Sequence, residues 1–219
     1  MIILFNGPPG SGKDAAADFF KKFGFKHLSY KYQLYREVIE HYGVDQKWFM
    51  SRYNNRDLKE EPTPLLDGLS CRQAMIHVSE EIIKPKLGQD YFGNIVANEI
   101  DLTKNYAISD GGFVEELLPV INKVGKDNFI LVQLARDGCD YSSDSRRYFK
   151  GGIRYEYVLG HKTPIEEKYV LPYNFDVKCY RINNNSSIED FYESLTDIFE
   201  RETKGIYYGE QARSSRRFA

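Results

Sequence analysis

Short apolar runs alternate along the chain with segments in which apolar residues recur at helical spacing. Residues 2–6 (IILFN) are almost wholly apolar, which is typical of a strand that is buried on both faces of a sheet. Ala16, Phe20 and Phe23 then recur at spacings of four and three, which predicts a helix soon after this strand. The chain therefore opens with a strand, a loop and a helix.

The same alternation continues through the rest of the chain. Further strands are predicted at residues 105–110 (NYAISD), 128–136 (NFILVQLAR) and 175–182 (FDVKCYRI). Helices are predicted over residues 115–124, ending at Gly125, and over residues 188–200, where Ser187 provides the N-terminal cap. Strands that alternate with helices predict an α/β fold, in which a parallel sheet is flanked by helices on both faces.

One more amphipathic helix is predicted to begin at Ser70. Its apolar stripe consists of Cys71, Ala74, Met75, Val78 and Ile82. At 3.6 residues per turn, Arg72 stands about 100° from this stripe, so it flanks the core without entering it. Two interpretations remain open for Arg72: an ordinary surface arginine, or one that presents its planar fork to a phosphate.

Two stretches interrupt the regular pattern and are interpreted as insertions beside the sheet. Residues 42–68 are polar, aromatic and rich in charge, and residues 137–174 are rich in Gly, Ser, Arg and Tyr, with short hairpin strands expected around 151–160 (GGIRYEYVLG). Long irregular segments of this kind are either solvated loops or lids over a binding site. Residues 1–219 are otherwise expected to form a single domain, with a flexible tail over 205–219.

Charge and composition exclude several classes of partner. The 30 basic and 32 acidic residues nearly cancel, so the bulk charge predicts neither a nucleic-acid partner nor a membrane surface. No basic leader and no apolar stretch of membrane-spanning length is visible, which favours a soluble cytoplasmic protein. The three cysteines form no CxxC pair, and the four histidines show no ligand spacing, so we expect no disulfide framework and no transition metal.

The loop after the first strand carries the clearest chemical signal. Residues 7–14 (GPPGSGKD) match the phosphate-binding pattern GxxxxGK between a predicted strand and a predicted helix. Glycines let the backbone N–H groups of such a loop point at phosphate oxygens, and the helix N-terminus adds positive potential. Lys13 would reach the outer phosphates. The residues expected to bind ATP are Gly7, Gly10, Ser11, Gly12, Lys13, Asp14 and Ala15.

Asp14 departs from the usual form of this pattern. A Ser or Thr normally follows the lysine and offers its hydroxyl to Mg²⁺. A carboxylate at this position can hold Mg²⁺ directly or through water, because hard cations prefer oxygen ligands. We therefore expect Mg²⁺ as the cofactor, with Asp14 as its protein ligand.

The carboxylate also makes a resemblance specific. Residues 7–19 fit GxxxSGKDxxADF and are followed by KYQL at 31–34, which resembles the deoxynucleoside monophosphate kinases of T-even-type bacteriophages. The similarity continues in SCRQAM at 70–75, in Tyr91, in an Asp that ends a strand at Asp110 and in an Arg that ends the next strand at Arg136. It covers most of residues 1–136, is strong only in the loop, and fades beyond Arg136.

This resemblance implies a P-loop NTPase fold, transfer of phosphate from ATP to a deoxynucleoside monophosphate, and a homodimer in the host cytoplasm. It also implies an acceptor site made of Lys31, Arg72, Tyr91, Phe92, Asp110 and Glu116. For Tyr91 and Phe92, the residues themselves fit a core position equally well. The family has an Arg two positions after the Asp, where this chain has Gly112, so one acceptor contact must be absent or supplied from elsewhere.

Phosphoryl transfer gives the arginines their expected role. A monophosphate is largely ionised at neutral pH, so the enzyme needs positioning and charge neutralisation more than a base. In addition to Lys13, the candidates for charge neutralisation are Arg72, Arg136, and the neighbours Arg146 and Arg147. The last two could equally belong to a solvated loop, with Asp144 as a surface ion partner.

Other functions remain as alternatives. A kinase of another phosphorylated metabolite is one, because animal-type phosphomevalonate kinases share the GKD ending. A nucleotide-gated module that touches DNA through its basic tail is another, although the chain has no basic stripe. A GTPase is disfavoured, since the nearest string to NKxD is NKVG at 122–125, which lacks the aspartate.

Overall fold

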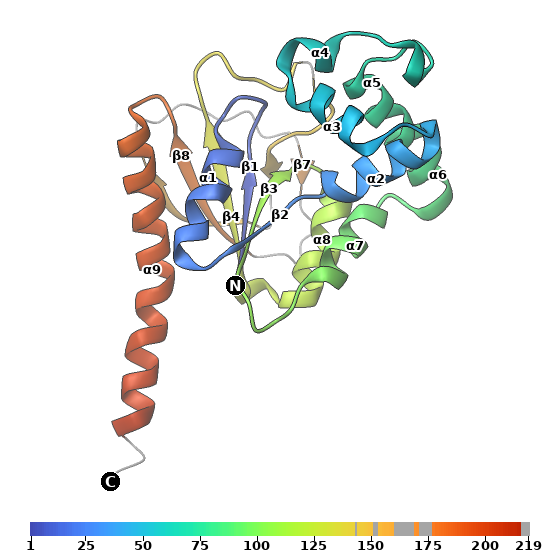
Figure 1. Cartoon of the computed structure of the whole chain (residues 1–219). Helices are drawn as coiled ribbons and strands as arrows, with labels where there is room; N and C mark the ends of the chain where they lie inside the picture. Colours follow the sequence, from blue (N-terminus) through green and yellow to red (C-terminus); the bar gives the residue numbers. More distant parts are fainter. Residues whose placement is uncertain (143, 151–152, 160–168, 171–176, 216–219) are drawn as a thin grey trace.

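The core of the protein is a six-stranded, wholly parallel sheet. The computed structural model describes residues 1–142, 144–150, 153–159, 169–170 and 177–215. The strands lie in the order β2 (Lys26–Leu28), β3 (Tyr106–Gly111), β1 (Ile2–Asn6), β4 (Phe129–Ala135), β8 (Val177–Asn183) and β6 (Ile153–Leu159). A separate parallel pair consists of β5 (Phe149–Lys150) and β7 (Tyr169–Val170). Figure 1 shows this arrangement.

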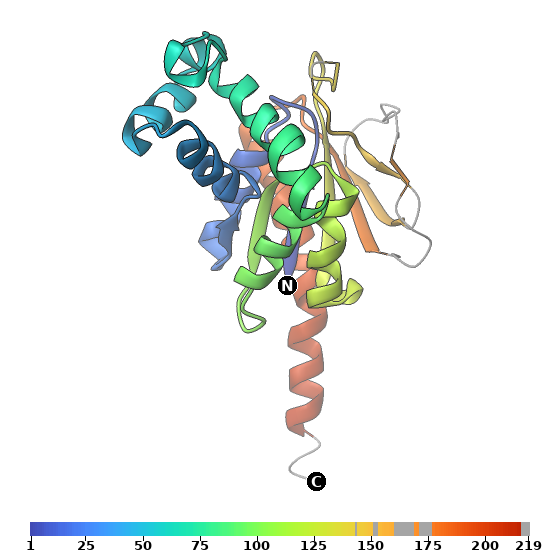
Figure 2. The ribbon, with the colours of Figure 1, turned by 90° about the vertical axis from the view of Figure 1, so that its right-hand side faces the viewer.

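Helices cover both faces of the sheet because side chains alternate along each strand. Ile2 and Leu4 pack on the face covered by α7 (Tyr91–Glu99) and α8 (Val114–Val124). Ile3 and Phe5 pack on the opposite face, against α1 (Lys13–Phe20) and α9 (Ile188–Ser215). The three layers confirm the predicted α/β fold, and Figure 2 shows them from the side.

A third apolar core holds together a helical lobe beside the sheet. The lobe, residues 31–87, contains α2 (Lys31–Tyr42), α3 (Gln46–Asn54), α4 (Arg56–Glu60), α5 (Cys71–Ile76), a π-helix (His77–Ile83) and α6 (Lys84–Leu87). Its buried residues include Val38, Phe49, Leu66 and the predicted stripe on α5. Ser70 caps α5 in a reciprocal capping box with Gln73. Shorter 3₁₀ turns lie at Lys21–Phe23, Pro64–Leu66 and Lys126–Asn128.

The pattern of the sequence located most elements of the sheet layer correctly. The predicted strands became β1, β3, β4 and β8, and the predicted helices became α1, α8 and α9. Ser187 caps α9 as expected, since its hydroxyl accepts a hydrogen bond from the Asp190 backbone N–H at 3.1 Å. The structure continues this helix to Ser215, well into the segment expected to be a flexible tail. Among the described helices, none is both long enough and apolar enough to cross a bilayer.

Two expectations about the insertions were wrong. Residues 42–68 are not irregular, because α3, α4 and a 3₁₀ turn occupy most of them. The expected hairpin near residue 155 is not formed by the described strands: β6 pairs in parallel with β8 at the edge of the main sheet, and β5 pairs with β7. The rest of the expected insertion, residues 143, 151–152, 160–168 and 171–174, lies outside the described residues.

Candidate active site

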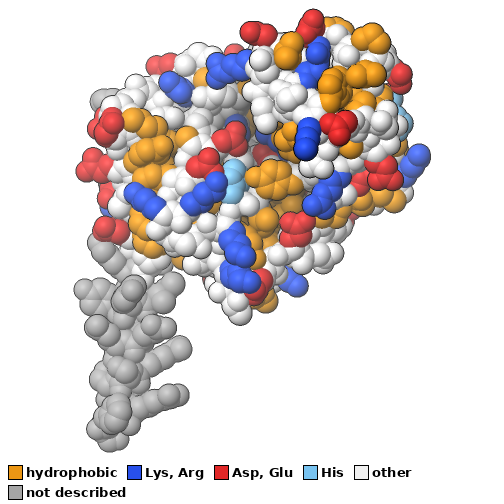
Figure 3. All heavy atoms as spheres, viewed as in Figure 1, with side chains coloured by type: hydrophobic (Ala, Val, Ile, Leu, Met, Phe, Trp, Pro, Cys, Tyr) orange, Lys and Arg blue, Asp and Glu red, His pale blue; other side chains and the backbone are white. Residues whose placement is uncertain are grey.

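A cleft of about 620 Å³ lies between the carboxyl edge of the sheet and the helical lobe. This volume falls within the range of small-molecule sites. Figure 3 shows the surface hollowed between these two parts of the molecule. The cleft brings together nine of the site residues selected from the sequence: Gly10, Lys13, Asp14, Lys31, Arg72, Phe92, Asp110, Glu116 and Arg146.

The loop between β1 and α1 has the backbone geometry that its glycines permit. Gly10 and Gly12 adopt positive φ angles of 82° and 104°, a region that other residues rarely occupy. A Cβ on Gly12 would also lie 2.7 Å from the Asn184 side-chain nitrogen. That nitrogen donates a hydrogen bond to the Ser11 carbonyl at 3.0 Å, so the loop is tied to the segment after β8.

Lys13 begins α1 and folds back over the loop. Its ammonium donates hydrogen bonds to the carbonyls of Gly7 and Pro8, both at 2.6 Å. Burial, followed by the positive charges of Arg146 and Lys31, lowers the pKa of Lys13 to about 7. Because neutral carbonyls compensate a buried charge poorly, an anionic ligand placed here would stabilise the ammonium.

Asp14 is exposed in the first turn of α1 and lines the cleft next to Lys13. Its carboxylate fits a Mg²⁺ ion that keeps most of its water and is shared with a phosphate. The neighbouring Ser11 hydroxyl is buried and has no hydrogen-bond partner among the described residues. Both side chains offer oxygen atoms beside the glycine-rich loop.

A buried amide fixes the segment that carries Arg146. Asn6, the last residue of β1, donates hydrogen bonds to the carbonyls of Gly111 at 3.1 Å and Arg147 at 2.9 Å. Its side-chain oxygen accepts a hydrogen bond from the Phe149 backbone N–H at 3.1 Å. Gln133 on β4 adds a hydrogen bond to the Phe149 carbonyl at 2.9 Å. Neither Asn6 nor Gln133 was predicted from the sequence, although each is a polar residue that lies within or ends an apolar run.

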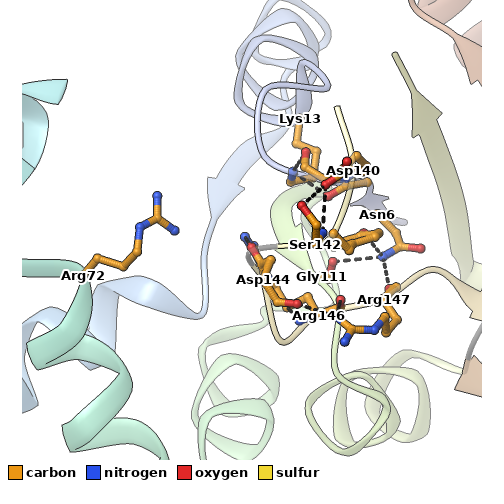
Figure 4. A network of polar contacts seen from close by, with 12 residues as sticks. Asn6, Lys13, Arg72, Gly111, Asp140, Ser142, Asp144, Arg146 and Arg147 are labelled. Carbon is orange, nitrogen blue, oxygen red and sulfur yellow. Dashed lines mark hydrogen bonds and ion pairs between the residues drawn. The ribbon is translucent and has the colours of Figure 1, made fainter. Parts of the chain in front are cut away.

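Arg146 is held rigidly at the wall of the cleft (Figure 4). Its Nε and Nη2 atoms contact the two carboxylate oxygens of Asp144 at 2.9 and 2.5 Å. Burial alone would raise the pKa of Asp144, but its hydrogen bonds and ion pair with Arg146 outweigh burial and lower it to about 2. The Asp144 side chain is therefore buried and holds Arg146 in place, whereas the sequence left open that it was a surface ion partner.

Gly112 makes this position of Arg146 possible. A Cβ at Gly112 would lie 2.4 Å from Cβ, 2.5 Å from Cγ and 2.7 Å from Cδ of Arg146. The aliphatic stem of Arg146 thus rests on the backbone of Gly112. The glycine, at the position where the resemblance would place an arginine, leaves room for Arg146, which comes from another segment and lines the cleft.

Arg147 and Arg136, which were also predicted to be catalytic, make contacts outside the cleft. Arg147 directs its Nη1 atom to the backbone carbonyls of Asp144 and Arg146. Arg136 is exposed and reaches the Gly10 carbonyl at 3.5 Å, at the edge of hydrogen-bonding distance. Neither side chain lines the cleft.

Arg72 faces the loop from the helical lobe. In Figure 4 it extends from α5 towards the group formed by Lys13, Asp144 and Arg146. Its Nε atom donates a hydrogen bond to Glu60 at 2.8 Å, and both side chains remain substantially exposed. A pair this exposed contributes little stability, so Arg72 could exchange Glu60 for a phosphate at small cost.

The remaining predicted acceptor residues have different environments. Asp110 is buried and accepts hydrogen bonds from the Ser29 hydroxyl at 2.7 Å and from the backbone N–H groups of Tyr30 and Lys31, both at 3.1 Å. It thereby fixes the start of α2, where Lys31 lines the cleft. Phe92 packs in the core and also reaches the cleft, as either interpretation allowed.

Tyr91 does not line the cleft. Its hydroxyl donates a hydrogen bond to Glu37 at 2.9 Å, and its ring packs at the edge of the core. Of the two aromatic residues predicted near the acceptor, only Phe92 lies at the cleft wall.

Glu116 belongs to a charge cluster that was not predicted from the sequence, in which Lys84 and Glu116 are buried and Glu80 is partly exposed. Lys84 contacts Glu116 at 3.4 Å and Glu80 at 2.8 Å. Burial raises the pKa of Glu116 to about 7, against the opposing positive charge of Lys84. Glu80 reaches this position from the π-helix, whose wider turn changes which side chains face the cleft.

No family model and no curated protein matches this chain.

Proposed function

We propose that the chain is a P-loop kinase that transfers the γ-phosphate of ATP to the phosphate of a deoxynucleoside 5′-monophosphate. One observation carries the proposal: a single cleft contains Lys13 and Asp14 from the glycine-rich loop, Arg72 opposite them, and Arg146 on the same wall. This arrangement suits two phosphate groups that approach each other from opposite ends. The resemblance of residues 7–19 supports the same conclusion.

Different residues would position the two substrates and neutralise the charge of their phosphates. The backbone N–H groups of the loop and Lys13 would bind the β- and γ-phosphates of ATP. Arg72 would hold the acceptor phosphate through its fork, and Arg146 would stabilise the charge on the transferring group. Mg²⁺, held by Asp14, would neutralise charge on the ATP phosphates. No side chain has to remove a proton, since the acceptor phosphate is already largely ionised.

The charge of the cleft favours a nucleotide over phosphomevalonate as the acceptor. The wall away from the loop combines the aromatic rings of Phe92 and Phe113 with the carboxylates of Glu80 and Glu116. Only Lys84 compensates these two carboxylates in the described cluster. A phosphomevalonate molecule would bring its own carboxylate towards this acidic end, whereas a nucleobase brings an uncharged aromatic ring.

An ADP-release assay across the nucleoside and deoxynucleoside monophosphates tests the proposal, with ATP alone and phosphomevalonate as the comparison reactions. We expect ADP release that depends on a deoxynucleotide. Lys13→Ala should lower this rate on the order of a hundredfold, while the matched control Lys22→Ala, on an exposed position of the same region, should leave it unchanged. Activity with phosphomevalonate alone, or a folded Lys13→Ala protein with full activity, would overturn the assignment.

A further inference from the structure

The end of the cleft formed by the π-helix and α8 carries two carboxylates, of which Glu80 also accepts a hydrogen bond from the Ser79 hydroxyl at 2.8 Å. The two carboxylates of Glu80 and Glu116 share one ammonium, that of Lys84, which lies only 3% exposed. Lys84 is also engaged by the ring of Phe113, whose centroid lies 4.0 Å from the ammonium. Glu80 and Glu116 line the cleft and Lys84 lies behind them, so the side presented to a ligand is a hydrogen-bond acceptor.

A second observation points independently to a ligand. Tyr30 lines the same cleft and is 5% exposed, and its hydroxyl has no hydrogen-bond partner among the described residues. Burial raises the pKa of Tyr30 well above its ordinary value, and the negative charges of Glu116 and Asp110 raise it further. Buried hydroxyl groups are nearly always paired in proteins, so an orphaned one beside a cleft indicates a group that binding supplies.

The walls around these polar atoms include aromatic and aliphatic side chains. Phe113 and Phe92 border the cleft next to Glu116, and Leu34 and Met75 border it on the side of the helical lobe. Apolar and aromatic walls suit the two faces of a planar ring, while the few polar atoms fix its orientation through its edge. The opposite end of the cleft, with Lys13, is basic.

We propose that this end of the cleft is a base-reading subsite in which Glu116 accepts a hydrogen bond from a ring N–H group of the acceptor nucleobase. The inference rests on the proposed function, because it takes the acceptor to be a nucleotide whose phosphate lies at the basic end. The ligand group that this subsite would bind is a planar, uncharged heterocycle with an N–H donor on the edge that forms base pairs in nucleic acids. Guanine and thymine present such a ring N–H beside a carbonyl.

The test compares each of two nucleotides with an analogue that lacks this donor. Binding of dGMP and N1-methyl-dGMP, and of dTMP and N3-methyl-dTMP, is measured by calorimetry without ATP. For the wild type we expect, in at least one pair, that the methylated analogue binds at least about tenfold more weakly than its parent nucleotide. In Glu116→Ala, which removes the acceptor and leaves space for a methyl group, the two members of that pair should differ by less than about threefold.

Two further variants separate hydrogen bonding from folding and from bulk charge. Glu116→Gln keeps the size of the side chain and should reduce the discrimination without loss of thermal stability. Glu115→Gln removes a charge from an exposed neighbour on the same helix and should discriminate as the wild type does. Equal binding of both members of each pair to the wild type, undiminished discrimination in both Glu116 variants, or no binding of either parent nucleotide would overturn the subsite.

The proposed function can fail separately from the subsite. A protein that discriminates the methylated analogues in calorimetry, but releases no ADP with any monophosphate, would retain the subsite and lose the kinase assignment. A protein with deoxynucleotide-dependent ADP release, but no discrimination, would retain the kinase assignment and lose the subsite.

Discussion

Gly112→Ala provides the sharpest test of the site, because it adds one methyl group and removes none of the proposed functional side chains. The new Cβ would lie 2.4 Å from the Cβ of Arg146, whereas carbon atoms in contact are separated by about 3.5 Å or more. The stem of Arg146 must therefore retreat by about 1 Å. Gly112 does not have a positive φ, so backbone strain does not contribute.

The expected loss follows from this displacement. Arg146 is fixed by two contacts with Asp144, and a shift of its stem would pull the guanidinium away from the proposed position of the transferring phosphate. A misplacement of 1 Å can lower the rate of an enzyme about a hundredfold, which corresponds to about 2.7 kcal/mol of transition-state stabilisation. We expect this loss in kcat, with the KM values for ATP and the monophosphate changed by no more than a few-fold.

The assay is ADP release at saturating concentrations of both substrates, with the melting temperature as a check on folding. Gly24→Ala is the control, because Gly24 has a positive φ of 81° and open space around it, so it tests backbone strain without a clash. The double variant Gly112→Ala/Arg146→Ala should be no slower than Arg146→Ala alone, since both changes act through the same arginine. A folded Gly112→Ala protein with kcat within twofold of the wild type would refute the reasoning.

Three further predictions concern the groups that would contact phosphate or metal. Arg72→Lys keeps the charge but loses the fork, so the KM for the monophosphate should rise about tenfold, or about 1.4 kcal/mol, with that for ATP within twofold; equal changes in both would contradict an acceptor role. Asp14→Ala should raise the Mg²⁺ concentration needed for half-maximal rate, and Asp14→Ser should restore part of the activity; an unchanged Mg²⁺ dependence would exclude a metal ligand. Since the pKa of Lys13 is about 7 in the free protein, this group is mostly neutral at pH 8, and ATP binding should take up a proton there. Calorimetry in two buffers of different ionisation enthalpy measures this proton uptake, and we expect Lys13→Met to take up no proton. If Lys13→Met took up as many protons as the wild type, the proton would be assigned to another group.

The strand, loop and helix at the start of the chain could be predicted because local signals agree there. An apolar run, a glycine-rich turn and helical spacing follow one another within residues 2–20, and each is decided by neighbours in the sequence. The helices of residues 46–60 could not be recognised in the same way. Their polar and aromatic composition resembles that of a loop, and their stability comes from packing Phe49 against Val38 and Leu66 in the lobe.

Strand pairing and the charge cluster depend on contacts between distant residues. The glycines near residue 151 suggested a local hairpin, but β6 instead extends the main sheet through β8. Lys84 and Glu116 come from different helices, and the π-helix before Lys84 shifts the register on which helical spacing relies. Arg72 was placed correctly beside the apolar stripe, because its position depends only on the helix that carries it.

Of the six basic side chains that line the cleft, those of Arg146, Arg72 and Lys13 have partners that determine how each would respond to a nucleotide. Arg146 is paired with a carboxylate that is 7% exposed, and breaking such a pair would leave a buried charge without compensation, so we expect Arg146 to stay in place. Arg72 and Glu60 form an exposed pair, whose loss costs at most about 1 kcal/mol. Within the described part of the chain, Lys13 donates hydrogen bonds only to two carbonyls, and its positive charge is destabilised by burial. Phosphate binding would therefore move Lys13 and Arg72 towards the ligand while Arg146 provides the fixed point, which is why a displacement of Arg146 should affect turnover and a change at Arg72 should affect binding.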